Sequence, residues 1–125
     1  MRPDLIGKRV LVVGLGLTGR SMVRWLVARG AVVYQNQCFA CHGAEGAGNG
    51  PVVGPGKFPL GPSLVAGTAA GRSDGYIYAI VRVGRGLMPA YGPRISHTDR
   101  WAVTSYVRSL QSGGVPAAAA VPAAV

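Results

Sequence analysis

The segment Cys38-Phe-Ala-Cys-His42 constrains this chain more than any other feature, because it has the spacing of a CxxCH motif. Two thiols at this spacing can each add to a vinyl group of a porphyrin, and the histidine that follows then lies beneath the iron. Cys38 and Cys41 are the only cysteines among the 125 residues. The motif therefore predicts one haem c, bound covalently through Cys38 and Cys41, with His42 as an axial ligand of the iron.

A zinc site, a thioredoxin-like redox centre and a simple disulfide are the other uses of a CxxC pair. A zinc site needs about two further ligands at short spacing, and only His97 and scattered carboxylates remain. A redox CxxC should end a strand of a βαβ unit, whereas glycine and proline follow this segment instead. The neighbouring sequence favours haem attachment.

Met88 is the predicted second ligand of the iron. It lies in a loop, Gly84–Gly92, in which glycines permit tight turns and Pro89 stiffens the chain directly after the sulfur. These neighbours make Met88 a poor core residue, although core packing is the usual role of a lone methionine. His97 is the competing ligand, but it lies in a polar run before a predicted helix, where a surface position is expected. His42 and Met88 are therefore the predicted metal ligands.

The composition predicts a thin protein core. The chain has 20 glycines and 9 prolines but only two phenylalanines and two tryptophans. A small chain of this kind buries little apolar surface without help from a cofactor or cross-links. A covalently held porphyrin would supply the missing apolar mass, so we expect the haem-free chain to be largely unfolded.

The N-terminal residues show a different pattern. Residues 8–13 are apolar enough for a buried strand, residues 14–19 form a GxGxxG turn, and residues 20–29 have helical periodicity. Residues 1–33 resemble the start of Mur ligases, in particular the ligase that adds D-glutamate to UDP-N-acetylmuramoyl-L-alanine. The resemblance implies weak nucleotide contacts from four residues: Gly14, Gly16, Thr18 and Gly19.

A working ligase is excluded by the length of the chain. One strand and one helix cannot form a parallel sheet that is buried on both faces, and no catalytic domain follows them. We therefore expect residues 1–33 to be a non-autonomous β-α fragment, an incomplete Rossmann-like unit. The alternative function is a truncated or chimeric Mur ligase N-terminus with residual UDP-sugar binding and no ligase activity.

Residues 30–34 fit either a strand or a helix. Ala31–Tyr34 could begin a second strand. On a helix, Gly30, Tyr34 and Cys38 share one face because they are four residues apart, and the glycine permits close approach of another helix. Helix is favoured, since the CxxCH motif needs a support and nothing downstream completes a sheet.

An export signal is a third interpretation of the N-terminus. Three basic residues lie within the first nine, and ten uncharged residues run from Val10 to Gly19. Arginines at positions 20, 24 and 29 then interrupt the region where cleavage would occur, so we expect no cleavable signal peptide. No run is long and apolar enough to span a membrane. We expect a periplasmic or extracytoplasmic location if the chain is exported, and a cytoplasmic one if this N-terminus is genuine.

Two more helices are predicted after a loop over Gly43–Gly61 that is rich in glycine and proline. The first covers Ser73–Val81 with Ser73 as its N-cap, and three of its residues should face the haem: Ile77, Ile80 and Val81. The second covers about residues 98–111 and starts at a capping-box variant, Ser96–Asp99. Its apolar face, formed by Val103, Tyr106, Val107 and Leu110, should cross Gly30 and Tyr34.

These features together resemble a class I monohaem cytochrome c over residues 34–111. Three segments resemble, more narrowly, the monohaem cytochrome subunit of alternative complex III, a bacterial quinol:cytochrome c oxidoreductase: Asp74–Tyr78, Gly86–Tyr91 and Asp99–Gln111. The resemblance implies a mainly α fold in which N- and C-terminal helices cross over a covalently bound haem. It divides the chain into residues 1–33, a cytochrome domain at 34–112 and a disordered Ala/Pro tail at 113–125.

The resemblance also implies contacts around the haem. The carbonyl of Pro62, or failing that of Pro59, would accept the Nδ1 proton of His42 and so fix its ring. Tyr78 and Trp101 are further candidates for contact with the haem, although core packing is the competing role of Trp101.

The implied function is that of a one-electron carrier and not of an enzyme. Such a carrier exchanges electrons with redox proteins or with other subunits of a respiratory membrane complex. His/Met ligation favours a positive reduction potential, which suits electrons from quinol-linked donors. The net charge of +9 is dispersed and lacks a nucleic-acid-binding motif, so no nucleic-acid partner is expected. Arg82, Arg85 and Arg94 bracket Met88 and could steer an acidic partner, pair with haem propionates or form a solvated face.

Overall fold

The computed structural model of the protein describes residues 17–113. Within that range the chain forms no strand, and its helices are α1 (Leu17–Gln37), α2 (Phe39–His42), the 3₁₀ helix η1 (Gly67–Gly71), α3 (Asp74–Val83) and α4 (His97–Gln111). The predicted mainly α fold class is confirmed. None of the helices in the described range has the length and apolar composition needed to cross a membrane.

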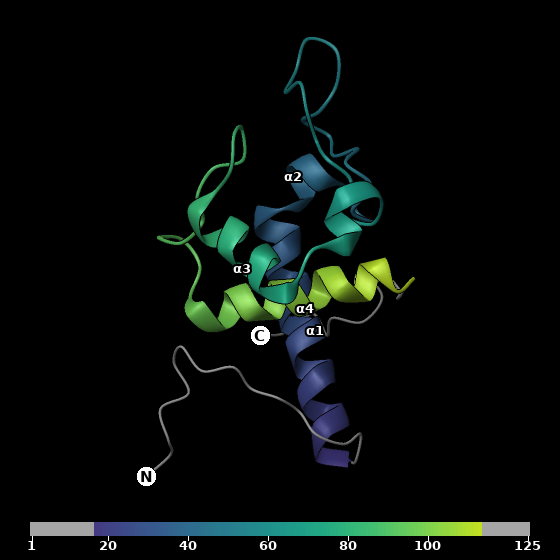
Figure 1. Ribbon diagram of the computed structural model, residues 1–125, viewed down its shortest axis with the longest axis vertical. Helices are drawn as coiled ribbons and strands as arrows, with labels where there is room; N and C mark the ends of the chain where they lie inside the picture. Colours follow the sequence, from purple (N-terminus) through teal and green to yellow (C-terminus); the bar gives the residue numbers. More distant parts are fainter. Residues whose placement is uncertain (1–16, 114–125) are drawn as a thin grey trace.

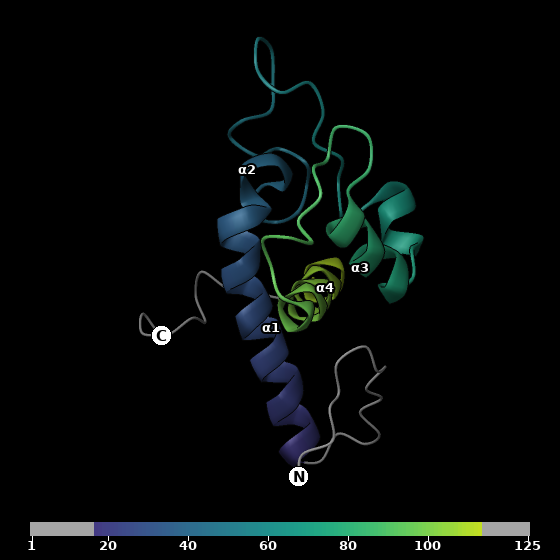
Figure 2. The ribbon, with the colours of Figure 1, turned by 90° about the vertical axis from the view of Figure 1, so that its left-hand side faces the viewer.

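The two long helices, α1 and α4, cross each other, as Figures 1 and 2 show. The remaining elements lie on the side of α4 from which the C-terminal half of α1 emerges, and the N-terminal half of α1 extends beyond the crossing on the other side. The molecule therefore has a body of short helices and loops above α4 and a projecting helical arm below it.

Gly30 lies at the point where α1 and α4 touch. A Cβ atom at this position would lie 2.0 Å from the backbone oxygen of Ala102 and 2.8 Å from Cβ of Tyr106. Only glycine allows the two helix backbones to approach this closely. The structure confirms that Gly30 and Tyr34 meet the face of α4 that carries Tyr106.

The core is small and surrounds this crossing. The rings of Tyr34 and Tyr106 lie 5.1 Å apart between centroids at an angle of 59°, a favourable geometry for an aromatic pair. Tyr34 and Val103 are the largest side chains that are almost fully buried. The other buried apolar residues come mainly from the same two helices: Ala31, Val33, Val81, Ile95, Ala102, Val107 and Leu110.

Helix α1 is longer than the sequence predicts, because it joins the helix expected at residues 20–29 to residues 30–34. The helical interpretation of residues 30–34 is confirmed, and the alternative strand at Ala31–Tyr34 is wrong. The β-branched Val32 and Val33 favour a strand locally, but the contact of Gly30 and Tyr34 with α4 decides for helix. The boundary expected between residues 33 and 34 thus falls inside α1, and the strand expected at residues 8–13 lies outside the described residues.

The predicted starts of α3 and α4 are confirmed by their caps. Ser73 Oγ accepts a hydrogen bond from the Tyr76 amide at 3.2 Å, and Ser96 Oγ accepts one from the Asp99 amide at 3.1 Å. Each serine satisfies an amide that the helix itself leaves unpaired. The sequence did not predict η1, whose small residues carry no periodic pattern.

An ion pair on the outer surface also joins the crossing helices. Arg29 of α1 binds Asp99 of α4 through two contacts, Nε to Oδ1 at 2.8 Å and Nη2 to Oδ2 at 2.9 Å. The hydrogen bond from Arg29 is the main cause that lowers the pKa of Asp99 below its ordinary value. The backbone amide of Asp99 also donates to Ser96 Oγ. The ionised carboxylate is therefore the form that the folded state prefers.

Replacing Gly30 by alanine should lower the free energy of unfolding by about 1–3 kcal/mol, because a backbone oxygen cannot move aside as a side chain would. Gly75 of α3 is the matched control, since nothing lies within 4 Å of its would-be Cβ atom. Gly75→Ala should raise the stability by about 0.5–1 kcal/mol through helix propensity. Urea unfolding measures both effects, and a Gly30→Ala protein as stable as the wild type would contradict the close crossing.

Replacing Asp99 by asparagine should weaken the dependence of stability on acid pH. A carboxylate whose pKa is lowered on folding stabilises the protein above its unfolded pKa, and this stability is lost as the pH falls through the folded pKa. Asp99→Asn should be less stable at pH 7 and should lose less stability between pH 5 and pH 2. Urea unfolding between pH 5 and pH 2 measures this difference, with Glu45→Gln as a control for the loss of one exposed negative charge. Equal pH profiles of stability for the wild type and Asp99→Asn would contradict the role of the Arg29–Asp99 pair.

Candidate functional site

The CxxCH segment continues directly from α1. The Cys38 amide donates to the Tyr34 carbonyl at 2.8 Å, which extends the hydrogen bonding of α1 by one residue, and the His42 amide donates to the Cys38 carbonyl at 2.9 Å within the short helix α2. The hydroxyl of Tyr34 donates to the Gly43 carbonyl at 2.6 Å. The position of α1 therefore determines where both cysteines and His42 lie.

Gly43 ends α2 and turns the chain away from the motif. It has a φ of +78°, which favours glycine, and a Cβ atom there would lie 2.2 Å from Oδ1 of Asn49. Both cysteines are free and half-buried. Burial, with a smaller contribution from Cys41, raises the pKa of the Cys38 thiol to about 12, so this thiol is protonated near neutral pH.

His42 is buried, with 7% of its surface exposed, and its ring is fixed by Pro62. Nδ1 of His42 lies 3.0 Å from the Pro62 carbonyl oxygen. A carbonyl oxygen only accepts, so Nδ1 carries the proton and Nε2 keeps a free lone pair. Burial lowers the pKa of His42 and the hydrogen bond to Pro62 partly opposes this. The structure thus contains the hydrogen bond expected between these two residues, and Pro59 is not the partner.

Met88 is held in a tight two-residue hairpin. Arg85 and Met88 exchange two backbone hydrogen bonds, each of 3.0 Å. Gly86, the first central residue, has a φ of +57°, whereas no non-glycine residue among residues 17–113 has a positive φ, and this pattern fits a type II′ turn. Gly84 approaches so closely that its Cβ would lie 2.5 Å from the Met88 carbonyl oxygen. The glycines that flank Met88 therefore serve the turn that presents it.

Two cavities adjoin the CxxCH segment, with volumes of about 90 and 230 Å³. Both are lined by the same five residues: Cys38, His42, Pro62, Arg85 and Met88. Cys41 lines the smaller cavity. The structure therefore brings the five predicted residues Cys38, Cys41, His42, Pro62 and Met88 to one place, although 50 residues of sequence separate Cys38 from Met88.

The walls of the larger cavity are mainly apolar. The three residues of α3 that were predicted to face the haem all line it: Ile77, Ile80 and Val81. Tyr34, Val103 and Val107 contribute from the crossing of α1 and α4. Two thiols, an imidazole with a free Nε2 and a thioether sulfur in an apolar cavity form a donor set that fits a haem.

Tyr78 and Trp101, also predicted to contact the haem, do not line either cavity. They stack on each other at 4.4 Å between ring centroids, between α3 and α4. Ile77 and Val81 line the larger cavity, and Tyr78 points about a quarter of a turn away from Ile77. Contact of Tyr78 and Trp101 with a haem stays a prediction, and the observed contact of Trp101 is the stacking on Tyr78. Arg100 holds this group, since its Nε donates to the Tyr78 hydroxyl at 3.1 Å.

His97, the competing ligand, belongs to the same aromatic group. Its Nδ1 lies 2.7 Å from the Tyr78 hydroxyl, and it does not line either cavity. As the first residue of α4, it lies beside Tyr78 of α3 and Trp101 of α4, with ring centroids 5.5 and 6.5 Å away, respectively. Met88 is thus the one of the two candidates that the fold brings to His42.

The arginines near the site differ from those that the sequence indicated. Of Arg82, Arg85 and Arg94, only Arg85 lines the cavities. Arg72, which the sequence analysis missed, lines the larger cavity as well. No motif contains Arg72, and the only sequence signal is its place beside the N-cap Ser73, at the junction of η1 and α3.

Thr18 and Gly19 lie in the first turn of α1. Gly14 and Gly16 lie outside the described residues. The predicted nucleotide contacts therefore involve the end of the helical arm, remote from the two cavities.

Comparison with known proteins connects this site to one family. The model of the family described as cytochrome c oxidase, cbb3-type, subunit III matches residues 26–107. The match covers the CxxCH segment, Pro62 and Met88, and it begins within α1.

Curated relatives are also named as subunits of cbb3-type cytochrome c oxidase. The cbb3-type cytochrome c oxidase subunit FixP of Azorhizobium caulinodans is 37% identical over 86 residues, which are 68% of this chain and 27% of FixP. Subunit CcoP of Azospirillum sp. strain B510 is 34% identical over 79% of this chain and 33% of its own length. Subunit CcoP of Cereibacter sphaeroides is 30% identical over 79% of this chain and 32% of its own length. The chain spans about a third or less of the length of these relatives.

A solved structure shares the fold. A chain of the Kuenenia stuttgartiensis reducing HAO-like protein complex superposes with a TM-score of 0.60 at 28% identity, over 86% of this chain and 54% of that chain. The comparisons do not support the resemblance of residues 1–33 to a Mur ligase. The relatives are oxidase subunits, so the narrower resemblance to alternative complex III is not supported by them either.

Proposed function

We propose, because the chain belongs to the family of cytochrome c oxidase, cbb3-type, subunit III, that it is a c-type cytochrome with one covalently bound haem c. In this proposal it carries single electrons within a bacterial respiratory complex. The domain that does so comprises residues 34–112, supported by the rest of α1. The family implies haem c, and the number of haems and the covalent linkage are part of the proposal.

One observation carries this proposal. His42 is buried, and its Nδ1–H donates a hydrogen bond to the Pro62 carbonyl oxygen, which leaves the Nε2 lone pair free. Met88 and Cys38 line the same two cavities as His42, and Cys41 lines the smaller one. A histidine that is fixed through Nδ1 is oriented to bind a metal through Nε2.

Each residue of the site has a separate role in the proposal. Cys38 and Cys41 would hold the porphyrin through thioether bonds, and His42 and Met88 would bind the iron. When bound, the haem supplies the one-electron redox couple. Pro62 keeps the His42 ring in one orientation, and the Arg85–Met88 turn keeps the thioether in place, so the ligands need little rearrangement when the charge of the site changes.

Electrons would enter or leave beside the smaller cavity. Leu60 and Leu87 line it and are 58% and 55% exposed, respectively. Exposed apolar residues around an opening mark a surface for contact with another protein. No bond is made or broken in such a transfer, so we propose that this chain acts as an electron-transfer component and not as an enzyme by itself.

The names of the relatives support a proposal for the partners and the location of this chain. FixP and the two CcoP proteins are named as subunits of cbb3-type cytochrome c oxidase. We propose that this chain exchanges electrons with other subunits of such a membrane complex or with a redox protein that docks on it, and that it does so on the extracytoplasmic face of the membrane.

Replacing Met88 by alanine should abolish the spectroscopic signature of His/Met ligation in the haem-bearing protein and lower its reduction potential, because the thioether favours the reduced iron. The covalent linkage through the cysteines should persist in this variant. The absorption spectrum and a redox titration measure both effects.

Two variants serve as controls for Met88→Ala. Met22→Ala removes a methionine of α1 that is 43% exposed and lines neither cavity, and His97→Gln removes the competing ligand. Both should keep the wild-type spectrum. A Met88→Ala protein with an unchanged spectrum, or a His97→Gln protein that loses the wild-type spectrum, would refute the ligand assignment.

A further inference from the structure

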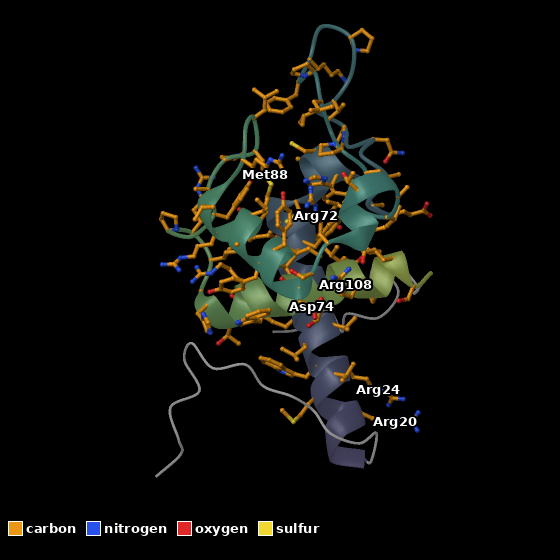
Figure 3. The ribbon with its side chains drawn as sticks, viewed as in Figure 1. Arg20, Arg24, Arg72, Asp74, Met88 and Arg108 are labelled. Atoms are coloured by element: carbon orange, nitrogen blue, oxygen red, sulfur yellow. The ribbon has the colours of Figure 1, made fainter. Side chains whose placement is uncertain are left out.

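Two arginines line the larger cavity, whose wall is mainly apolar. Arg72, at the junction of η1 and α3, and Arg85, at the start of the Met88 turn, both line it. Figure 3 shows Arg72 within the body of the molecule beside α3, whereas Arg20 and Arg24 project from the far end of α1. Both residues are exposed to solvent and line the cavity as well, so a ligand that fills the cavity would lie beside two positive charges.

Tyr76 connects the two arginines. The guanidinium carbon of Arg72 lies 4.4 Å from the centroid of the Tyr76 ring, in a cation-π contact. Nη1 of Arg85 donates a hydrogen bond to the Tyr76 hydroxyl. Tyr76 also lines the larger cavity. One aromatic side chain therefore orients two guanidinium groups from different segments toward the same space.

The backbone of Arg72 is fixed as well. Nη2 of Arg108, on α4, donates to the Arg72 carbonyl, and Nε of Arg108 binds Asp74 Oδ1 at 2.6 Å. Arg108 of α4 therefore fixes the backbone of Arg72, from which the side chain extends to the cavity.

The described part of the protein offers these arginines no carboxylate. Residues 17–113 contain three acidic residues, Glu45, Asp74 and Asp99. Asp99 pairs with Arg29 and Asp74 pairs with Arg108, and these are the ion pairs of the described range. Glu45 lines neither cavity. Among the described residues no carboxylate forms an ion pair with Arg72 or Arg85, so both guanidinium groups can bind an anionic ligand in the cavity.

We propose that Arg72 and Arg85, oriented by Tyr76, form a carboxylate-binding pair that receives the propionate groups of the haem. The inference rests on the proposed function, since a haem is the carboxylate-bearing ligand that the adjoining donor set fits. Guanidinium groups suit this role because they stay charged and bind carboxylates through two parallel hydrogen bonds. The pair would set the orientation of the haem in the cavity and would tune its reduction potential.

The tuning has a definite sign. A positive charge near the iron favours the reduced state, which carries one positive charge fewer, and it also favours the ionised form of a propionate. Removing the charge should lower the reduction potential at alkaline pH, where propionates are ionised in both redox states. It should also move the pH-dependent part of the potential to higher pH, because the carboxylates then bind protons more readily.

The test is a redox titration of the haem-bearing protein over pH 5 to 10, followed by visible absorption. Arg72→Gln and Arg85→Gln should each show a lower potential at the alkaline end and a pH transition shifted upward. Arg72→Lys, which keeps the charge, should lie between the wild type and Arg72→Gln. Tyr76→Phe, which removes the hydroxyl that Arg85 binds, should shift the transition in the same direction and by less.

Arg20→Gln is the matched control, because it removes the same charge from the helical arm without touching the cavity. If Arg72→Gln and Arg85→Gln give the same profile as Arg20→Gln, the carboxylate-binding pair is refuted while the proposed function stands. A wild-type protein that carries no haem when produced with haem attachment would refute the proposed function and this inference with it.

Discussion

The contact of α1 with α4 at Gly30 determines where every part of the candidate site lies. Because Cys38 continues the hydrogen bonding of α1, the crossing fixes the direction in which the CxxCH segment leaves the core. The C-terminal end of α4 positions the segment that contains Pro62, the hydrogen-bond partner of His42. Gln111, the last residue of α4, donates to the Leu64 carbonyl at 2.8 Å, two residues after Pro62. The hydrogen bond between His42 and Pro62 therefore joins two segments that the same pair of helices positions.

The Met88 turn depends on the crossing through α3. The Tyr91 amide donates to the Val81 carbonyl and the Gly92 amide to the Arg82 carbonyl, each at 3.0 Å, so the chain that returns from Met88 is tied to the end of α3. Val81 is buried in the same core as the crossing helices. The core of the described residues is small and adjoins a cavity of about 230 Å³. A haem in that cavity would complete the core, which gives the cofactor a structural role beside its redox role.

The features that the sequence predicted well are those that local chemistry specifies. Ser73 and Ser96 cap helices through contacts within three residues, and the apolar face of α4 follows from its spacing alone. The CxxCH segment is recognised by its spacing, and Met88 is recognised by the glycines and the proline that flank it. The features that were missed depend on tertiary contacts. At residues 30–34 helix was predicted correctly, but the strand alternative could be rejected only by the packing at Gly30, which outweighs β-propensity.

Which side of α3 faces the cavity also depends on packing that the sequence does not display. Tyr76 and Tyr78 lie on either side of Ile77, each about 100° away around the helix, so the sequence alone could not tell which of them lies beside the larger cavity. The structure places Tyr76 there and stacks Tyr78 on Trp101. Arg72 could not be found from a motif, since its role arises from the meeting of the η1–α3 junction with the distant Met88 turn.

The most direct measurement is acid–acetone extraction of the purified protein, followed by absorption spectroscopy of the protein pellet and of the organic phase. Our account predicts that the haem stays with the protein, because thioether bonds to Cys38 and Cys41 survive the treatment, and that the reduced spectrum is of the c type. Haem that passes into the organic phase would contradict covalent attachment. A protein without haem, when produced in cells that attach haem to other c-type cytochromes, would contradict the account as a whole.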